Sequence, residues 1–367
     1  MTTDERYMSR ALDLAARRRG WTSPNPMVGC VVVRDRRIIG EGYHERAGAP
    51  HAEVNAIRAA GDIGDATLYV TLEPCCFHGK TPPCSDLIIE GRPARVVVAM
   101  LDPNPRVSGA GIRQLREAGI GVEVGVLEVE AQRLNEAYIA FITTGRPFVI
   151  AKCGMSLDGK IATRNGDSHW VTCEASRRRV HELRHEVDAI LVGSRTVNLD
   201  DPSLTTRLDA AESRDPVRVI LDADGCLDRA RRVFHLESEA PTWVALPEGR
   251  TFDGADETLH LPRSGDGVDM AALMDALGAR AITSVLIEGG GATHASAFAA
   301  RVVDKVLFFI APKIIGGRDA ITPVEGDGAE RMADVVHLES MCAEPVGEDI
   351  LIEAYVRKEQ CGCSPAS

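Results

Sequence analysis

Apolar residues recur at two alternating periods through the first 145 residues, which predicts helices and strands in turn. Residues 4–19 carry them at helical spacing, with acidic side chains in the first turn and arginines just before Gly20, as in an amphipathic helix. Short apolar runs predict strands at 30–33, 38–43, 67–72, 95–100 and 121–126, the first two paired as a hairpin. Further helices are expected at 51–61, 111–118 and 130–144, and one more completes the order α-β-β-α-β-α-β-α-β-α.

A second α/β pattern begins after the break at Gly145-Arg146-Pro147. Strands are predicted at 148–153, 189–192, 218–222, 243–246, 285–288 and 306–311, with helices at 174–186, 270–277 and 292–300 among them. This alternation favours a mostly parallel sheet, which strands after Met332, such as 349–356, are expected to close. We therefore predict two domains, residues 1–145 and 146–367, with a disordered tail at 358–367.

Composition agrees with a soluble two-domain protein. A chain of 367 residues exceeds one typical domain, and 44% hydrophobic with 26% charged residues is ordinary for globular proteins. No apolar run approaches the length of a membrane span, and the ten cysteines are scattered as in a reduced cytosolic enzyme. We therefore expect a cytoplasmic protein with no membrane partner, and no redox or metal role for Cys361 and Cys363 in the tail.

The net charge of −12 is concentrated in the second half of the chain. Residues 1–146 hold 18 basic and 18 acidic side chains, whereas residues 147–367 hold 24 basic and 36 acidic ones. Neither half carries the basic field that nucleic-acid binding needs, so we expect no nucleic-acid partner.

The residues with metal-binding chemistry gather between positions 51 and 84. His51, Cys75 and Cys84 provide one imidazole and two thiolates, the ligand set of a zinc site with an open fourth position. Glu53 follows the histidine by two residues, as does the non-ligand carboxylate in the H-x-E…P-C-x-x-C signature of zinc deaminases. Eight residues rather than two separate the cysteines here, so the general signature fits only with an insertion.

The predicted elements can bring these ligands together. His51 begins a helix directly after Pro50, and Cys75 follows the strand predicted at 67–72, with a break at Pro74. A strand end that faces a helix N-terminus is where α/β folds place ligands. A closed structural zinc site is the alternative, with Cys76 or His78 as the fourth ligand, but it leaves Glu53 unexplained.

The inserted loop carries a specific resemblance. Residues 71–84, TLEPCCFHGKTPPC, resemble the bifunctional riboflavin-biosynthesis deaminase/reductase family, whose loop reads close to T-L-E-P-C-S-H-x-G-[RK]-T-P-P-C. That family has the long spacing between the cysteines. Two positions depart from it, since Cys76 replaces the usual Ser and Phe77 the usual His.

The resemblance implies a cytidine-deaminase-like three-layer domain in the first half. It makes His51, Cys75 and Cys84 the zinc ligands and Glu53 the catalytic proton carrier. Substrate contacts are implied for three further residues that would otherwise be read as a turn residue and two surface side chains, namely Asn25, His44 and Lys80. The substrate would be a small phosphorylated pyrimidine, and a lysine suits its ribose phosphate.

A glycine-rich turn marks the second half. Strand 285–288 runs into Gly289-Gly290-Gly291 and then a helix, which presents backbone N–H groups to a phosphate. The spacing differs from the Rossmann fingerprint because the third glycine position is His294, so this turn alone is a weak indication. The same family shares its E-G-G, the motif K-x-G-x-S-L-D-G, the Ser168/Trp170 pair and T-V-x-x-D-D-P-x-L-T-x-R.

These motifs imply a dihydrofolate-reductase-like fold that binds NADPH. Contacts with the cofactor are implied for Gly154, Trp170, Thr196, Asp200, Gly290, Gly291, Ala292, Thr293, His294, Ala295 and Ser296. Contacts with the substrate are implied for Ser168, Arg184, Leu204, Arg207 and Glu288. The two arginines suit a ribose phosphate because a guanidinium matches phosphate oxygens.

The whole sequence thus predicts one chain with two successive active sites. Zinc would support deamination of a diaminopyrimidinone ribosyl phosphate, and NADPH would then reduce the ribosyl group to a ribityl chain. A homo-oligomer is compatible with this interpretation. Two alternatives remain: a nucleoside or tRNA deaminase with an appended reductase-like domain, and a non-catalytic zinc-stabilised module whose second domain binds a nucleotide.

Overall fold

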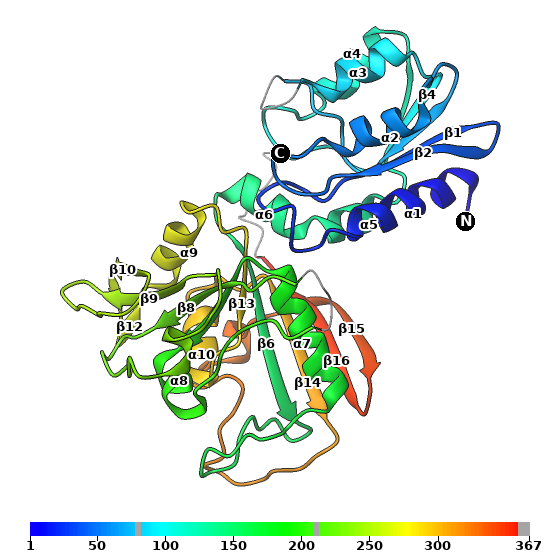
Figure 1. The fold of residues 1–367 in the computed structure, drawn as a ribbon. Coiled ribbons are helices and arrows are strands. Elements are labelled where there is room, and N and C mark those ends of the chain that lie inside the picture. Colours follow the sequence, from blue (N-terminus) through cyan, green and yellow to red (C-terminus); the bar gives the residue numbers. More distant parts are fainter. Residues whose placement is uncertain (78–81, 209–212, 359–367) are drawn as a thin grey trace, which may run out of the picture. The chain divides into compact units, whose positions relative to one another are not determined.

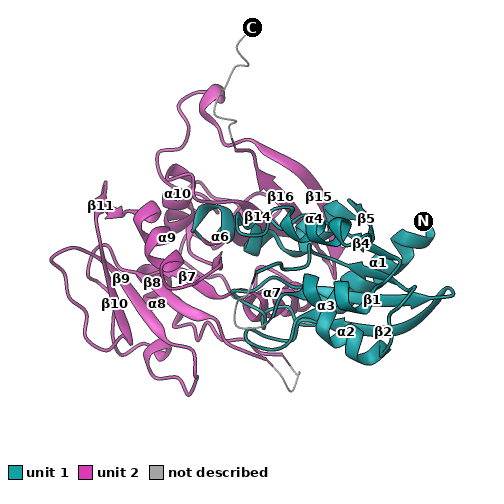
Figure 2. Ribbon diagram, turned by 90° about the horizontal axis from the view of Figure 1, so that it is seen from above, with its two compact units in different colours: residues 1–146 teal, residues 147–367 magenta. Residues whose placement is uncertain are grey.

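The computed structural model describes residues 1–77, 82–208 and 213–358. The chain divides into two compact units, residues 1–146 and 147–367, and each is described by itself (Figures 1 and 2). Lys80 and His78 lie outside the described residues, as do Cys361 and Cys363. In the part that is described, no helix combines the length and the apolar character needed to cross a membrane.

The first unit is built around a five-stranded sheet in the order β2-β1-β3-β4-β5. Its antiparallel pairs are β2–β1 and β1–β3, whereas β3–β4 and β4–β5 are parallel. In chain order it contains α1 (Thr3–Ala16), β1 (Gly29–Arg34), β2 (Arg37–Tyr43), α2 (Ala52–Ala60), β3 (Thr67–Val70), α3 (Cys84–Gly91), β4 (Arg95–Val98), α4 (Ala110–Glu117), β5 (Gly121–Val124), α5 (Glu128–Leu134) and α6 (Glu136–Thr144).

Alternating side chains of the central strands bury both faces of this sheet. Val32, Leu68 and Val96 pack beneath α2, α3 and α4, whereas Val31 and Val97 pack against α1 and α5 on the opposite face (Figure 1). Helices therefore cover both faces, and the predicted three-layer α/β architecture is confirmed.

One predicted helix is wrong. The single helix expected at 130–144 is two helices, α5 and α6, which meet at Asn135. The side chain of Asn135 accepts a hydrogen bond from the Met27 N–H (2.8 Å) and donates one to the Met27 carbonyl (3.0 Å). This pair of bonds to a residue more than a hundred positions away holds Asn135 in a non-helical conformation, with φ −110° and ψ 22°. The apolar periodicity of residues 130–144 contains no information about a contact with Met27, so it predicted one continuous helix.

The second unit has a nine-stranded sheet in the order β10-β9-β8-β7-β13-β6-β14-β16-β15. All pairs from β10 to β14 are parallel, which confirms the predicted mostly parallel sheet, and a strand at 349–356 closes it as expected. The pairs β14–β16 and β16–β15 are antiparallel, which the sequence did not predict. Its strands are β6 (Phe148–Ser156), β7 (Ala189–Gly193), β8 (Val217–Leu221), β9 (Thr242–Pro247), β10 (Glu257–Leu261), β13 (Ser284–Ile287), β14 (Lys305–Ala311), β15 (Leu338–Val346) and β16 (Asp349–Val356), with the separate small hairpin of β11 (Arg263–Ser264) and β12 (Gly267–Val268).

Helices and short helical turns surround this sheet. They are α7 (Glu174–Glu186), α8 (Ser194–Asp200), α9 (Met270–Gly278) and α10 (Gly291–Ala299), with 3-10 turns η1 (Arg232–Phe234) and η2 (Met332–Asp334). One face of the strands packs on α9 and α10 through Leu273, Leu277 and Ala297. The opposite face packs on Val197 of α8 and on Leu204 and Leu227. The bounds of α7 agree with the predicted helix at 174–186, whereas β10 and α8 were not predicted.

Close packing of α2 on the hairpin sets the position of the first candidate site. Gly42 lies on β2, and a Cβ there would clash with the backbone of Ala52 and Ala56 on α2. Because glycine has no side chain, the helix can approach the strand until the two backbones touch. This contact places the start of α2 against the sheet.

We predict that Gly42→Ala lowers the free energy of unfolding of the first unit by about 1–3 kcal/mol, because the new methyl group overpacks this contact. Gly121→Ala in β5 is the matched control, since its Cβ would meet only the Ala94 carbonyl at 3.4 Å, an ordinary contact. Urea unfolding measures the loss, and hydrogen exchange of the α2 amides assigns it to this unit. Equal stabilities of the two variants would contradict the prediction.

Candidate functional site

Three potential metal ligands meet at the start of α2 and α3. His51 is the N-cap residue of α2, Cys84 is the first residue of α3, and Cys75 lies beyond the end of β3. The Nδ1 atom of His51 lies 3.2 Å from Sγ of Cys84 and 3.5 Å from Sγ of Cys75. All three atoms lie within 4.8 Å of one another. The fold thus brings together the ligand set that the sequence indicated.

These separations fit a zinc ion. Bonds of about 2.0–2.1 Å to nitrogen and about 2.3 Å to sulfur at tetrahedral angles put a nitrogen and a sulfur ligand about 3.6 Å apart. The donors are also of the right chemical kind, because imidazole and thiolate are the usual ligands of zinc in proteins. In the described part of the chain, this is the group of three His, Cys, Asp or Glu side chains arranged to hold a metal.

Hydrogen bonds shift the pKa values of the two thiols in opposite directions. The Cys84 thiol donates to the Cys75 sulfur, and the His51 ring and the Cys84 backbone N–H (3.3 Å) also donate to it, which together lower the pKa of Cys75. The same contact with Cys75, with burial and the nearby Glu53 carboxylate, raises the pKa of Cys84. The two thiols therefore share one proton in a contact that a bound cation would replace.

Glu53 lies in the first turn of α2 and is almost fully buried, with 3% of its surface exposed. Burial and the negative charge of Cys75 raise the pKa of Glu53 to about 7. A carboxyl group in this state can both take and release a proton near neutral pH. The structure thus places a proton carrier directly beside the ligand set.

Two of the predicted substrate-binding residues lie next to these ligands. The buried His44 ring packs edge-on to the His51 ring, with centroids 5.6 Å apart. Its Nδ1 lies 3.2 Å from the Pro50 carbonyl, which can only accept, so Nδ1 carries the proton. Nε2 then accepts from the Asn25 amide at 3.1 Å. Burial lowers the pKa of His44, which keeps this ring neutral. The position of Lys80 lies outside the described residues.

Glu73 is a structurally important residue that the sequence analysis missed. This buried carboxylate accepts backbone N–H bonds from Asp102 (3.2 Å), Gly109 (2.9 Å), Gly111 (3.0 Å) and Ile112 (3.3 Å). It therefore caps α4, whose own N-cap residue is Gly109 and offers no side chain. The signal that could have pointed to Glu73 is that α4 begins after a glycine, so its cap must come from another part of the chain. Through Pro74 and Cys75, the capping bonds also fix the segment that carries one metal ligand.

In the second unit, Glu288 lies at the centre of a buried cluster of charges. Its carboxylate pairs with Arg184 through two bonds, of 2.7 and 3.0 Å, and with Lys152 through one of 2.9 Å. Burial alone would raise the pKa of Glu288, but Arg184 and Lys152 outweigh it and hold that pKa well below its ordinary value. Glu288 is therefore a permanent anion. Lys152, the first residue of the K-x-G-x-S-L-D-G motif, was given no site role from the sequence, and it is the second counter-ion of Glu288.

The glycine-rich turn has the geometry of a phosphate cradle. Gly290 is the N-cap residue of α10 and provides no capping side chain. A Cβ at Gly193 or Gly289 would meet the Thr293 side chain at 2.8 and 2.6 Å, respectively, so neither position has room for a side chain of its own. The side chains of Thr293 and His294 are buried, while Ala292 and Ser296 are exposed. Free backbone N–H groups at this helix start suit the phosphates of a dinucleotide such as NADPH.

Three other predicted cofactor residues lie on β6 and α8 of the same unit. Gly154 lies on β6, and a Cβ there would meet Thr172 at 2.9 Å. Thr196 and Asp200 lie on α8, with the Thr196 hydroxyl 3.4 Å from the position of a Cβ at Gly290. Thr196 therefore lies beside the glycine turn.

Trp170 is 63% exposed, and the loop that carries it is held by two cations. Lys313 donates from Nζ to the carbonyls of Trp170 (2.7 Å) and Val171 (2.8 Å), and the Arg177 guanidinium lies over the indole ring, 4.6 Å from its centroid. Ser168 is in the same loop, where its carbonyl accepts from the Val171 N–H. An exposed but anchored indole is available to a flat ligand ring.

Leu204 and Arg207 are in the loop that follows α8. Leu204 is buried with a φ of 56°, whereas Arg207 is exposed. Arg184 also donates from Nη1 to the Thr205 carbonyl in this loop, at 3.1 Å. The loop thus joins the charged cluster through Arg184.

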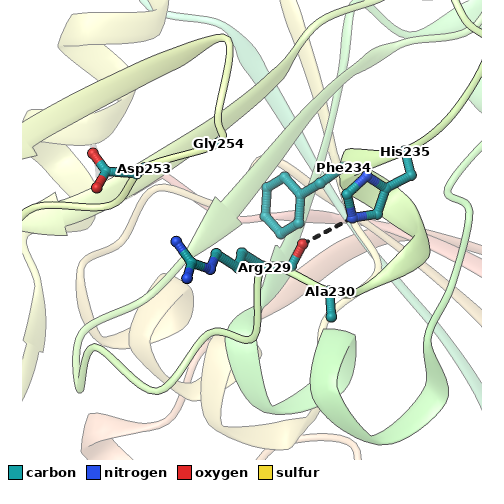
Figure 3. A pocket seen from close by; sticks show the side chains of 6 residues that line it. All are labelled: Arg229, Ala230, Phe234, His235, Asp253 and Gly254. Carbon is teal, nitrogen blue, oxygen red and sulfur yellow. Dashed lines mark hydrogen bonds between the residues drawn. The ribbon is translucent and has the colours of Figure 1, made fainter.

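A surface cavity of about 410 Å³ lies elsewhere on the second unit (Figure 3). Phe234, His235 and Arg229 line it, and His235 donates from Nε2 to the Arg229 carbonyl (3.0 Å). None of its lining residues is a candidate site residue, and neither candidate site depends on it.

Comparison with known proteins covers both units. Residues 1–100 match the cytidine and deoxycytidylate deaminase zinc-binding region, and residues 147–352 match the RibD C-terminal domain. The riboflavin biosynthesis protein RibD of Actinobacillus pleuropneumoniae is 42% identical over 96% of both chains. RibD of Escherichia coli is 41% identical over 95% of this chain and 98% of its own.

Solved structures match over the same length. A diaminohydroxyphosphoribosylaminopyrimidine deaminase/5-amino-6-(5-phosphoribosylamino)uracil reductase from Thermotoga maritima is 40% identical, with a TM-score of 0.86 over 97% of this chain and 99% of that one. RibD of Acinetobacter baumannii, at 34% identity, also gives a TM-score of 0.86 with the same coverage. The zinc-site domain and the reductase fold therefore occur together in single chains of this length.

We predict that Glu73→Gln lowers the free energy of unfolding by about 1.5–3 kcal/mol, because an amide NH₂ cannot accept the N–H bonds that one carboxylate oxygen accepts. The exposed Glu90 on α3 provides the matched control, Glu90→Gln. Urea unfolding compares the two variants, and faster hydrogen exchange at residues 109–112 would locate the change. Unaltered exchange there in Glu73→Gln would contradict the capping role.

Proposed function

The chain belongs to the RibD family of riboflavin-biosynthesis proteins, and on that premise we propose which of its residues carry out the two reactions. It is a bifunctional enzyme, a zinc-dependent deaminase and an NADPH-dependent reductase. The first reaction deaminates 2,5-diamino-6-ribosylamino-4(3H)-pyrimidinone 5′-phosphate, and the second reduces the ribosyl group of the product to a ribityl chain. The observation that carries the assignment of residues is the meeting of His51, Cys75 and Cys84 beside the buried Glu53.

In the deaminase unit, His51, Cys75 and Cys84 would hold the metal. When bound, zinc supplies the Lewis acidity that lets water act as a nucleophile near neutral pH. Glu53 takes the proton of that water and returns it to the departing amine nitrogen. Its burial favours this return, since the proton has no direct path from the carboxyl group to bulk water.

Asn25 and His44 orient the pyrimidine ring in the deaminase site. Their mutual hydrogen bond and the bond from His44 to Pro50 fix both side chains beside His51. A neutral, fully hydrogen-bonded imidazole adds no positive charge next to the metal ligands. Lys80 is proposed to bind the substrate phosphate, on the family motif alone.

In the reductase unit, residues from Gly290 to Ser296 contact the cofactor, and its phosphates bind at the free backbone N–H groups of the first turn of α10. Gly154, Trp170, Thr196 and Asp200 complete the cofactor site. When bound, NADPH supplies the hydride. Arg207 and Arg184 bind the substrate phosphate. Arg184 uses three of its five N–H donors for Glu288 and Thr205, so two remain for the phosphate. Ser168, Leu204 and Glu288 make the other substrate contacts.

We also propose that the enzyme acts in the cytoplasm on small phosphorylated pyrimidines, with neither nucleic acid nor a membrane as partner, and that it can form a homo-oligomer. The cysteines in the described part of the chain are all free thiols, which supports a reducing compartment. The absence of a basic excess from both halves supports a small-molecule substrate.

We predict that Glu53→Gln retains zinc but loses about 10²–10⁴-fold in deamination rate, because the amide cannot carry the proton. Cys84→Ser is expected to lose both zinc and deamination. Metal analysis and a steady-state assay of ammonia release measure the two effects. Both variants should still reduce the deaminated compound when it is supplied directly, and loss of that reduction in Glu53→Gln would contradict two independent sites.

Metal removal should separate the two reactions. After treatment with a chelator, the enzyme is expected to leave the diaminopyrimidinone substrate unchanged, yet still reduce the deaminated compound when NADPH is present. Mass spectrometry of the products follows both steps, as replacement of an amino group by oxygen and as the addition of two hydrogens. Zinc-loaded enzyme without NADPH is the matched control and should give only the deaminated product. Deamination by metal-free enzyme would refute the proposed zinc site.

A further inference from the structure

Three consecutive residues of the loop after α8 are held by three side chains. The Thr205 carbonyl accepts from Arg184 (3.1 Å), the Thr206 N–H donates to Asp215 (2.8 Å), and the Arg207 N–H donates to Nδ1 of His181 (3.3 Å). Arg184 and His181 both project from α7, three residues apart and therefore on one side of that helix. The backbone around Arg207 is thus held by two side chains of α7 and by Asp215 at the far end of the same loop, while the Arg207 side chain is exposed.

The bond to His181 requires one protonation state of the ring. A backbone N–H is always a donor, so Nδ1 must present its lone pair, and the single proton of the neutral ring lies on Nε2. Protonation of Nδ1 would remove that lone pair. The Arg207 N–H would then face another N–H, and the bond would be lost.

The groups around His181 favour the neutral ring. Burial and the positive charges of Arg184 and Arg207 lower the pKa of His181, and the Glu288 carboxylate and the Thr205 backbone act in the opposite direction. Glu288 is already paired with Arg184 and Lys152, so its charge is largely neutralised. The bond to Arg207 is therefore complete at neutral pH. It is lost in acid, as the pH falls through a folded-state pKa that lies below the ordinary histidine value of about 6.5.

We propose that His181 is a positioning residue of the reductase site, whose neutral imidazole holds the Arg207 backbone and so aims the Arg207 guanidinium at the substrate phosphate. This inference rests on the proposed function, which makes Arg207 a phosphate ligand. It adds a residue outside every sequence motif and a pH dependence for phosphate recognition. Acid weakens binding of the phosphorylated substrate because the loop loses one of its three anchors.

A neighbouring histidine provides the matched comparison. His185 lies one helical turn further along α7 and accepts the Arg214 N–H at 3.2 Å. Arg214 is itself held by an ion pair with the buried Asp188 (3.0 Å) and by the Val187 carbonyl, so this second bond stabilises a structural arginine. The same bond thus occurs twice on one helix, and the partner of His181 is a candidate phosphate ligand.

The experiment uses full-length, zinc-loaded enzyme and measures kcat and KM for reduction of the deaminated compound by NADPH. His181→Asn keeps an acceptor near the position of Nδ1 but cannot titrate, whereas His181→Leu removes the acceptor. Above pH 7, His181→Leu should raise KM about three- to tenfold, the worth of one hydrogen bond, with little change in kcat. His181→Asn and the control His185→Asn should stay near the wild-type KM.

The pH profile tests the titration itself. The wild-type KM should rise between about pH 6.5 and pH 5 relative to that of His181→Asn. The substrate phosphate titrates equally with both enzymes, so its contribution cancels in this ratio. With the dephosphorylated substrate, the effect of His181→Leu should disappear, because Arg207 then has no anion to bind.

Two results would overturn the proposal: an unchanged KM for His181→Leu above pH 7, or parallel pH profiles for the wild type and His181→Asn. Should His181→Leu fail to fold, as judged by circular dichroism, the comparison with His181→Asn still decides. Failure of the proposed function would look different, since the wild-type enzyme would then not reduce the deaminated compound at any pH.

Discussion

Each of the two proposed sites contains a glutamate whose side chain is shielded from solvent, and the groups that surround each carboxylate determine its charge. Glu53 is enclosed beside thiols and an imidazole, and burial raises its pKa to about 7. The Glu288 side chain is also largely shielded, with 6% of its surface exposed, but Arg184 and Lys152 lie against it and keep it ionised. Desolvation acts on both residues in the same direction, so the neighbouring charges account for the difference. One glutamate can therefore move a proton, while the other is a fixed negative charge that arranges two cations.

The fold delivers these groups at the ends of helices. His51 and Cys84 lie at the starts of α2 and α3, and Gly290 caps α10. Helix starts expose backbone N–H groups and a partial positive charge, which suit thiolates in the first unit and phosphates in the second. Glu73 shows the same principle in a structural role, since it supplies the missing cap of α4. The proposed metal site, the proposed phosphate site and the stability of α4 thus rest on one electrostatic feature of helices.

The sequence predicted those features that a local pattern can encode. His51, Glu53, Cys75 and Cys84 follow from residue type and spacing, and the helix at 174–186 follows from periodicity, because both depend on neighbours in the chain. The break at Asn135, the cap by Glu73 and the pairing of Lys152 with Glu288 depend on partners 108, 38 and 136 positions away, and no pattern within one segment contains that information. The sequence could not predict the role of His181 either. Its partner is the backbone N–H of Arg207, and every residue except proline has such a group. The roles of all these site residues remain predictions, and those of Lys80 and of the cofactor and substrate residues rest on the family motifs.

The place of β6 in the larger sheet has a consequence for how the protein is made. This strand begins at Phe148, yet its neighbours are β13 and β14, which end at Ile287 and Ala311. More than 150 further residues must therefore be synthesised after β6 begins before both of its neighbouring strands are present. Contacts between such distant segments slow folding and leave apolar strands exposed in the meantime. The first unit pairs strands that are close in sequence, so on the ribosome the deaminase half can fold while the reductase half is still incomplete.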